Sequence, residues 1–218
     1  MQTFIKVMFG FKQEIEAVTP DSYYPSIYKI DYQNLKKENI DTLLFDIDNT
    51  ITKVDDLNIP KETIELIRNL KEQKFKILLF SNNHEQRTKP VAQKLSLPLL
   101  SNAGKPSKEA YEKALNILNS NKENTAAIGD QLLSDIVGAK KYGIKAILVD
   151  QLSKENNIQT GMAQKLQKHM IKKLKKYKQF QIGEYYPSEK SKTSRWITIH
   201  PFFYIIIMIK YKWWYIYG

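Results

Sequence analysis

Short apolar runs alternate with amphipathic segments through the middle of the chain. The runs at residues 43–45, 76–80, 125–128 and 144–149 are rich in Leu, Ile, Val and Ala, and polar or turn-forming residues bound them. Continuous apolar runs of this length are typical of strands that are buried on both faces of a parallel sheet. They predict the strands of one central sheet.

The segments between these runs carry apolar residues at helical spacing. They predict helices after Pro60, over residues 85–95, after the loop at 104–107, and after Gln131, with Gly143 ending the last one. Strands that alternate with helices in this order require right-handed crossovers. The predicted fold class is therefore α/β, with a three-layer parallel sheet.

The two ends of the chain differ from this regular centre. Residues 1–40 are predicted to be an N-terminal extension that packs on the core, and residues 41–180 the main domain, which ends in a basic helix. Residues 181–218 form a linker and an apolar, aromatic tail. Its uninterrupted apolar run is shorter than the roughly 20 residues of a spanning helix. Three interpretations of the tail stay open: a membrane-interface anchor, a short transmembrane helix, or an appended sequence without a function.

Composition constrains the surface more than the fold. A chain of 218 residues can bury one sizeable core. It contains no Cys, which excludes disulfides and thiolate metal sites, and its N-terminus lacks the pattern of a secretory signal. The net charge of +11 predicts attraction to anions, whether anionic lipid, nucleic acid or a phosphorylated substrate.

The predicted basic helix concentrates this charge. Residues 161–181 carry Lys and apolar side chains but no acidic residue. Such a helix can lie on an anionic membrane, and it can equally be a terminal helix whose apolar side covers the sheet. A Lys-rich face does not distinguish one kind of phosphate from another, so nucleic-acid binding is not favoured but stays open.

Polar side chains follow successive predicted strands. Asp46 and Asp48 come after the first, Ser81 after the next and Asp130 after a later one, while Lys105 lies in an intervening loop. The carboxyl ends of parallel strands meet at one edge of a sheet, where ligands bind. We therefore expect these residues to form one site.

Local sequence alone leaves another interpretation of the first of these segments. Residues 48–50 read Asp-Asn-Thr, and these residue types also favour a turn with a helix cap. The functional prediction depends on the recurrence of polar groups at several strand ends.

Carboxylates, one hydroxyl and one Lys suit phosphoryl transfer. Asp46 lies closest to its strand and is the candidate nucleophile, which would form an aspartyl-phosphate. Asp46, Asp48 and Asp130 are the candidate ligands of Mg²⁺, with a carbonyl near Asp48 as another possible ligand atom. Asp48 also suits the general acid and base. Lys105 would balance the phosphoryl charge, while Ser81 and the backbone around Asn82 bind its oxygens.

The same residues carry a family resemblance. The segments Asp46–Thr50, Phe80–Asn83, Lys105–Pro106 and Gly129–Asp135 resemble the four ordered motifs of the haloacid dehalogenase (HAD) superfamily, and more narrowly those of its YqeG family of IIIA-type phosphatases. The resemblance extends from about residue 20 to about residue 150. It implies a HAD-like, Rossmann-like fold for the main domain, and Mg²⁺ as cofactor. It implies the roles given above at the matched positions, with Thr50 and Asp135 in support of the metal site or of Lys105.

The number of residues between the motifs limits what can cover the site, and therefore which substrates can reach it. Between Asp48 and Ser81 there is room for one loop, one helix and one strand, and little more before Lys105, so we expect no cap domain. A capless site can admit a phosphate that projects from something large. For this family the resemblance implies a phosphatidylglycerophosphatase, which would be a cytoplasmic protein in peripheral contact with the inner face of a membrane. Phosphoprotein, nucleotide or polynucleotide ends stay open as substrates, as does a non-catalytic basic module that binds lipid or nucleic acid.

Overall fold

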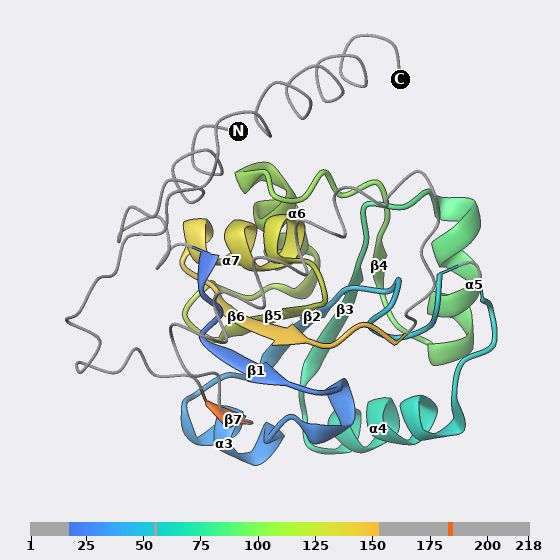
Figure 1. Ribbon diagram of the computed structural model, residues 1–218, viewed down its shortest axis with the longest axis horizontal. Coiled ribbons are helices and arrows are strands. Elements are labelled where there is room, and N and C mark those ends of the chain that lie inside the picture. Colours follow the sequence, from blue (N-terminus) through green and yellow to red (C-terminus); the bar gives the residue numbers. More distant parts are fainter. Residues whose placement is uncertain (1–17, 55, 153–182, 185–218) are drawn as a thin grey trace, which may run out of the picture. The chain divides into compact units, whose positions relative to one another are not determined.

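The structure is a computed structural model, and it describes residues 18–54, 56–152 and 183–184 (Figure 1). All of these belong to one unit of the chain, residues 17–191. The predicted basic helix lies outside the described residues. So do the start of the N-terminal extension and all of the C-terminal segment except Gly183–Glu184.

One sheet of seven strands organises the described residues. The strands are β1 (Ser22–Tyr24), β2 (Thr42–Phe45), β3 (Lys76–Phe80), β4 (Leu99–Leu100), β5 (Thr125–Gly129), β6 (Lys145–Val149) and β7 (Gly183–Glu184). Their order across the sheet is β4-β3-β2-β5-β6-β1-β7, and every neighbouring pair is parallel except β1 with β7. The predicted parallel α/β sheet is confirmed, and its longer strands coincide with the apolar runs.

The helices occupy the predicted connections. They are η1 (Ile27–Lys29), α3 (Tyr32–Lys37), α4 (Lys61–Glu72), α5 (Glu85–Leu95), α6 (Lys108–Leu118), η2 (Leu132–Ile136) and α7 (Val137–Tyr142). The predicted helix after Gln131 begins as a π-helical turn, η2, and continues as α7. Gly143 ends it in the left-handed region at φ 79°, which a side chain would disfavour.

Alternate side chains of the strands contact opposite layers. Phe45 belongs to a buried cluster with Ile67 of α4 and Val91 of α5. Phe80 packs edge-to-face on Tyr111 of α6, with ring centroids 5.1 Å apart. Figure 1 shows α4 and α6 on opposite sides of the sheet. The sheet is thus the middle of three layers, and the burial of both its faces explains its continuous apolar runs.

The order of the strands creates a crevice at the carboxyl edge. The chain runs outward from β2 through β3 to β4, and then returns to β5 on the other side of β2. Phe45 of β2 is paired with Leu79 on one side and with Ile128 on the other. The loops after β2 and β5 therefore diverge at a topological switch point, the usual ligand site of such sheets.

Residues 18–40 contribute a strand as well as packing. The strand β1 joins the sheet beside β6, and the Tyr23 hydroxyl donates a hydrogen bond of 2.6 Å to Asp150. Tyr32 of α3 packs edge-to-face on Phe75 at 6.1 Å. The sequence predicts only an extension that packs on the core. A strand of three residues has too little periodicity to be recognised beforehand.

No cap domain interrupts the described residues. Between β2 and β3 the described chain holds α4 with its loops, and between β3 and α6 it holds α5 and β4, as expected for a capless fold. None of the described helices is long and apolar enough to cross a lipid bilayer. The crevice is therefore bordered by loops of the sheet edge itself.

Candidate active site

Asp46 directly follows β2 at the switch point. Its backbone N–H donates to the Ile128 carbonyl at 2.9 Å, so the residue is still held by the ladder with β5. Its side chain is buried, and Lys105 Nζ lies 2.7 Å from Oδ1. The other oxygen, Oδ2, is buried and has no hydrogen-bond partner among the described residues. A buried carboxylate oxygen without a partner is costly, and a bound cation would offset that cost.

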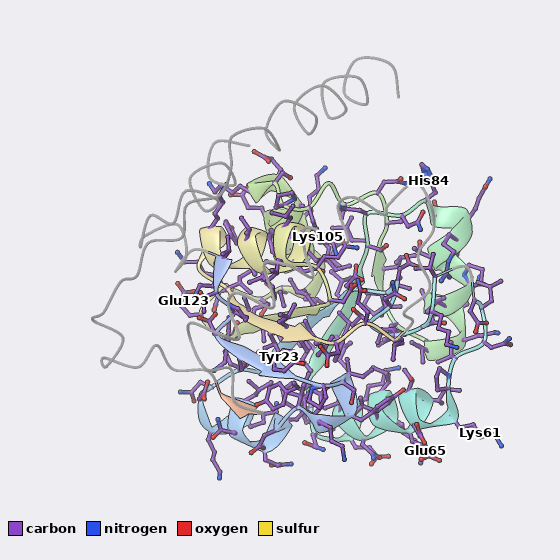
Figure 2. The ribbon with its side chains drawn as sticks, in the orientation of Figure 1. Tyr23, Lys61, Glu65, His84, Lys105 and Glu123 are labelled. Atoms are coloured by element: carbon purple, nitrogen blue, oxygen red, sulfur yellow. The ribbon has the colours of Figure 1, made fainter. Side chains whose placement is uncertain are left out.

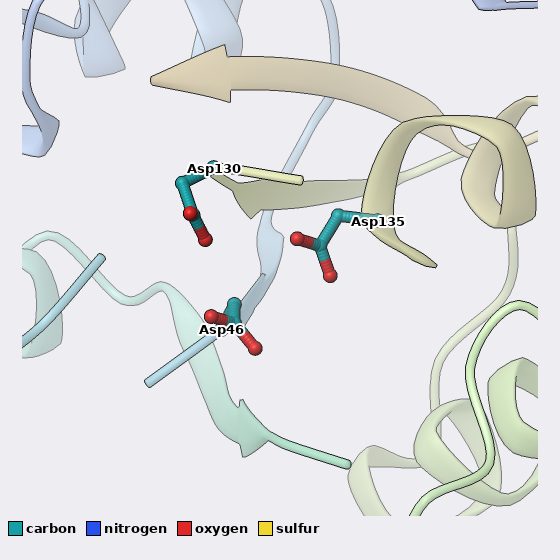
Figure 3. Close-up of side chains that lie close together, drawn as sticks. All are labelled: Asp46, Asp130 and Asp135. Carbon is teal, nitrogen blue, oxygen red and sulfur yellow. The ribbon is translucent and has the colours of Figure 1, made fainter. Parts of the chain in front are cut away.

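Asp46 belongs to a group of three carboxylates at this edge of the sheet. Figure 3 shows Asp46, Asp130 and Asp135 directed toward one another, and one oxygen of each lies within 4.8 Å of the others. Gly129 permits this approach, because a Cβ at that position would lie 2.3 Å from Asp135 Oδ2. Clustered carboxylate oxygens are the ligands that Mg²⁺ prefers in proteins. The donor set and the orphaned Oδ2 of Asp46 fit a hard divalent cation.

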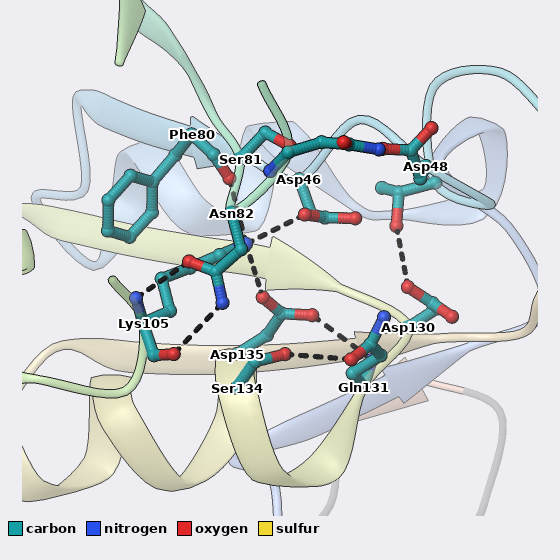
Figure 4. Close-up of polar contacts among 12 residues, drawn as sticks. Asp46, Asp48, Phe80, Ser81, Asn82, Lys105, Asp130, Gln131, Ser134 and Asp135 are labelled. Atoms are coloured by element: carbon teal, nitrogen blue, oxygen red, sulfur yellow. Dashed lines mark hydrogen bonds and ion pairs between the residues drawn. The ribbon is translucent and has the colours of Figure 1, made fainter. Parts of the chain in front are cut away.

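Lys105 balances part of this negative charge. Figure 2 shows it inside the fold, whereas Lys61 and His84 lie at the surface. Its ammonium donates to Asp46 Oδ1 and Asp135 Oδ1, both at 2.7 Å, and to the Phe80 carbonyl at 2.8 Å (Figure 4). These acceptors match its three N–H groups. Burial opposes the charged form, but the carboxylates of Asp135 and Asp46 raise the pKa of Lys105 above its ordinary value.

Ser81 and Asn82 directly follow β3 and lie beside the loop that carries Lys105. Asn82 Oδ1 accepts the Lys105 N–H at 2.7 Å, and its Nδ2 donates to the Lys105 carbonyl at 2.9 Å (Figure 4). The Asn82 side chain therefore positions Lys105, and a phosphate contact from this residue stays a prediction for its backbone N–H. Ser81 is buried, and its Oγ accepts the Asn83 N–H at 3.0 Å. The Ser81 hydroxyl retains its own hydrogen for donation.

Each of the other two carboxylates is held by neighbouring loops. The Gln131 N–H donates to Asp135 Oδ2 at 3.1 Å. Asp130 Oδ2 accepts from Gln151 Nε2 at 2.8 Å, and Thr50 Oγ1 lies 3.5 Å from Asp130 Oδ1. Thr50 and Asp135 thus lie beside the other carboxylates of the cluster, and their supporting roles stay predictions. Gln151 was not predicted, although its place just after β6 at the same sheet edge is a signal that could have found it.

Asp48 lies outside the group of three carboxylates. Its Oδ1 accepts from Arg87 Nη2 at 2.8 Å, and its Oδ2 accepts from Asn83 Nδ2 at 3.2 Å. The carboxylate cluster consists of Asp46, Asp130 and Asp135, and metal binding by Asp48 or by a carbonyl near it stays a prediction. The predicted role as general acid and base is unaffected. Arg87 and Asn83 themselves are contacts that the sequence did not reveal.

The segment around Asp48 is also a turn. Asn49 adopts the left-handed region at φ 60°, its N–H donates to the Thr52 carbonyl at 2.7 Å, and an isolated bridge pairs Asp48 with Thr52. The turn interpretation of residues 48–50 is therefore correct as local structure. No helix is capped there, because the next described helix, α4, begins at Lys61.

Burial shifts the ionisation of the cluster toward the neutral acids. Burial raises the pKa of Asp46 to about 7, against the opposing charge of Lys105. Burial, together with the charges of Asp46 and Asp135, raises the pKa of Asp130 well above its ordinary value. A divalent cation binds ionised carboxylates, so protons and the cation compete for these oxygens.

This competition predicts a pH-dependent stabilisation by Mg²⁺. Without metal, the free energy of unfolding should fall as the pH rises from about 4 to about 7, because a carboxyl whose pKa is raised by folding stabilises the fold only while protonated. Added Mg²⁺ should restore stability increasingly over the same window. The measurement is the thermal midpoint in EDTA and in Mg²⁺, with NaCl of equal ionic strength as control. A midpoint gain that is independent of pH would contradict the assignment.

The sequence is similar to that of phosphatases. Residues 43–106 match a family model described as haloacid dehalogenase-like hydrolase, and residues 102–174 match one described as HAD-hydrolase-like. The chain is 31% identical over 157 residues to Probable phosphatase YqeG of Bacillus subtilis (strain 168). That alignment covers 72% of this chain and 91% of the relative.

Solved structures with a related arrangement include proteins from several bacteria. An uncharacterized protein from Listeria monocytogenes serotype 4b is 20% identical, with 54% of this chain and 85% of that chain covered and a TM-score of 0.45. NagD from E. coli K-12 is 13% identical, with 55% and 90% covered and a TM-score of 0.43. The HAD-hydrolase YfnB from Bacillus subtilis, bound to magnesium, is 22% identical, with 47% and 49% covered and a TM-score of 0.39. At these TM-scores the three structures add no argument of their own.

Proposed function

Because the chain belongs to the haloacid dehalogenase-like hydrolases, and within them to the YqeG-type phosphatases, we propose that it removes the phosphate of phosphatidylglycerophosphate in a Mg²⁺-dependent reaction through an aspartyl-phosphate on Asp46. The observation that carries the proposed chemistry is the buried group of Asp46, Asp130 and Asp135 around Lys105, with Asp46 Oδ2 unpartnered among the described residues. A buried nucleophile beside a candidate cation site is what attack on an anionic ester requires.

The first proposed step is displacement at phosphorus. A carboxylate oxygen of Asp46 forms the new bond to phosphorus, the bond from phosphorus to the alcohol oxygen breaks, and Asp48 gives that oxygen a proton. Lys105 orients Asp46 through Oδ1. Mg²⁺ held by Asp46, Asp130 and Asp135 would supply positive charge against the repulsion between the two anions.

The second proposed step returns the enzyme to its starting state. Water attacks the phosphorus of the aspartyl-phosphate while Asp48 accepts its proton, and the bond between phosphorus and the Asp46 oxygen breaks. Inorganic phosphate leaves and Asp46 is again a carboxylate. The Ser81 hydroxyl and the backbone N–H groups after β3 are the proposed donors to the phosphoryl oxygens in both steps.

The lipid substrate is supported by access and by charge. No cap covers the crevice among the described residues, so a phosphate on a large surface can approach it. The net charge of +11 favours contact with an anionic membrane, and we place the protein in peripheral contact with its inner face. Proximity to anionic lipid would raise the local concentration of a phosphorylated headgroup.

Substrate choice provides the test of this assignment. We expect Mg²⁺-dependent release of phosphate from phosphatidylglycerophosphate in mixed micelles, and much slower release from a soluble nucleotide. EDTA should abolish the release, and Mg²⁺ should restore it. Preference for the nucleotide, a phosphopeptide or a polynucleotide end would overturn the lipid assignment and keep the chemistry. Absence of release from every one of them would favour the non-catalytic binding module.

A further inference from the structure

Arg87 of α5 connects the proposed general acid to the loop that follows it. Its Nη2 donates to Asp48 Oδ1 at 2.8 Å, to the Lys53 carbonyl at 3.0 Å and to the Asp56 carbonyl at 3.4 Å. The Arg87 side chain is 13% exposed and that of Asp48 is 15% exposed. An ion pair so largely withdrawn from water is screened less than a surface pair.

We propose that Arg87 is a positioning residue for the reaction, which holds the Asp48 carboxylate in the orientation for proton transfer. The inference rests on the proposed function, because it takes Asp48 as the general acid and base. It needs neither the lipid substrate nor the exact identity of the cation. Nothing in the four motifs of the sequence points to Arg87, which lies within α5.

The geometry explains why Asp48 needs external support. It sits in a tight turn rather than in a strand, since Asn49 beside it is left-handed. Both of its carboxylate oxygens are held from the segment after β3, one by Arg87 and the other by Asn83. Charge-assisted hydrogen bonds to both oxygens restrict rotation of the carboxylate about its own bonds. Its direction is thus set by an element other than its own.

The rest of the Arg87 guanidinium argues against a merely structural role. Its Nε and Nη1 are buried and have no hydrogen-bond partner among the described residues. Buried N–H groups without acceptors destabilise a fold, and this cost offsets part of the stabilisation that the ion pair with Asp48 provides. A residue that costs stability where it contacts a catalytic group is typical of a functional site.

If Arg87 positions Asp48, the kinetic effect of its removal should depend on the leaving group of the substrate. A purely structural role predicts no such dependence. Proton donation matters for a strongly basic leaving oxygen, such as that of an alkyl phosphate, and hardly matters for p-nitrophenolate, which leaves without a proton. General acid catalysis contributes on the order of 10²–10⁴-fold. Departure of the alcohol is the first irreversible step, so kcat/KM reports acid catalysis by Asp48 without the later hydrolysis of the aspartyl-phosphate. Removing Arg87 should therefore lower kcat/KM for an alkyl phosphate by about 10–100-fold, and kcat/KM for p-nitrophenyl phosphate by less than about 3-fold.

The experiment compares Arg87→Met with Arg87→Lys, and with Arg68→Met as a matched control on the exposed side of α4. Each is assayed with both substrates, and its thermal midpoint is measured. We expect Arg87→Met to keep the wild-type midpoint within a few degrees and to show the selective loss. Arg87→Lys should retain part of the activity on the alkyl phosphate that Arg87→Met loses. Combining Arg87→Met with Asp48→Asn should lower alkyl phosphate turnover no further than Asp48→Asn does.

Two outcomes would overturn the inference. One is an equal fall of kcat/KM with both substrates, which indicates general distortion of the site. The other is an additive loss in the Asp48 and Arg87 double variant. Failure of the proposed function is separately visible, because it appears as persistence of wild-type turnover in Asp46→Asn, whatever the Arg87 variants do.

Discussion

Replacing Asp46 with Asn is expected to abolish phosphatase turnover, by about 10⁴-fold or more. The amide is nearly isosteric with the carboxylate, but it is a poor nucleophile and a weaker ligand for a divalent cation. Among the described residues, the neighbouring carboxylates are held by further donors that Asp46 lacks: the Gln131 N–H donates to Asp135, and Gln151 donates to Asp130. The measurement is kcat under saturating Mg²⁺, with trapping of the acid-stable or borohydride-sensitive phosphoenzyme in the wild type.

The same substitution should leave the fold intact. The pKa of Asp46 is raised to about 7, so the ionised side chain destabilises the metal-free protein above that pH. A neutral amide removes this cost, and the thermal midpoint of Asp46→Asn in EDTA at alkaline pH should equal or exceed that of the wild type. Glu65→Gln, an exposed carboxyl on α4, is the matched control and should change neither property. Retention of turnover in a folded Asp46→Asn protein would refute the nucleophile.

Replacing Lys105 with Met is expected to damage both stability and activity. The Lys105 side chain is 2% exposed, and its ammonium lies 2.7 Å from carboxylate oxygens of Asp46 and Asp135. Its removal leaves buried carboxylates without their cation, which typically costs about 3–5 kcal/mol. The thermal midpoint in EDTA should fall by on the order of 10 °C. Loss of a preorganised charge beside the reacting phosphate should lower kcat by about 10²–10³-fold.

Metal binding separates the electrostatic cause from a packing defect. If Lys105 acts by neutralising the carboxylates, then Mg²⁺ should raise the midpoint of Lys105→Met by more than it raises that of the wild type. Lys108→Met, three residues later at the exposed start of α6, is the control and should leave the midpoint and kcat unchanged. An equal effect of Mg²⁺ on the wild type and on Lys105→Met would show that the loss comes from packing alone.

The sequence by itself determined the framework and most of the site. Buried parallel strands require continuous apolar runs, so β2, β3, β5 and β6 could be predicted from them. A polar residue at the end of such a strand must lie at the carboxyl edge, so Asp46 and Asp130 could be placed together before the structure was known. In the folded sheet β2 and β5 are neighbours, so Asp46 and Asp130 follow adjacent strands at the switch point.

Tertiary structure alone decided how the polar groups divide their work. Sequence spacing says which side chains reach one edge of a sheet, but the direction of a side chain depends on partners that are distant along the chain. Arg87 and Asn83 hold the two oxygens of Asp48, and the absence of a Cβ at Gly129 lets Asp135 join the carboxylate cluster. Hydrogen bonds and close contacts of this kind form only after the chain has folded, so no local pattern records them.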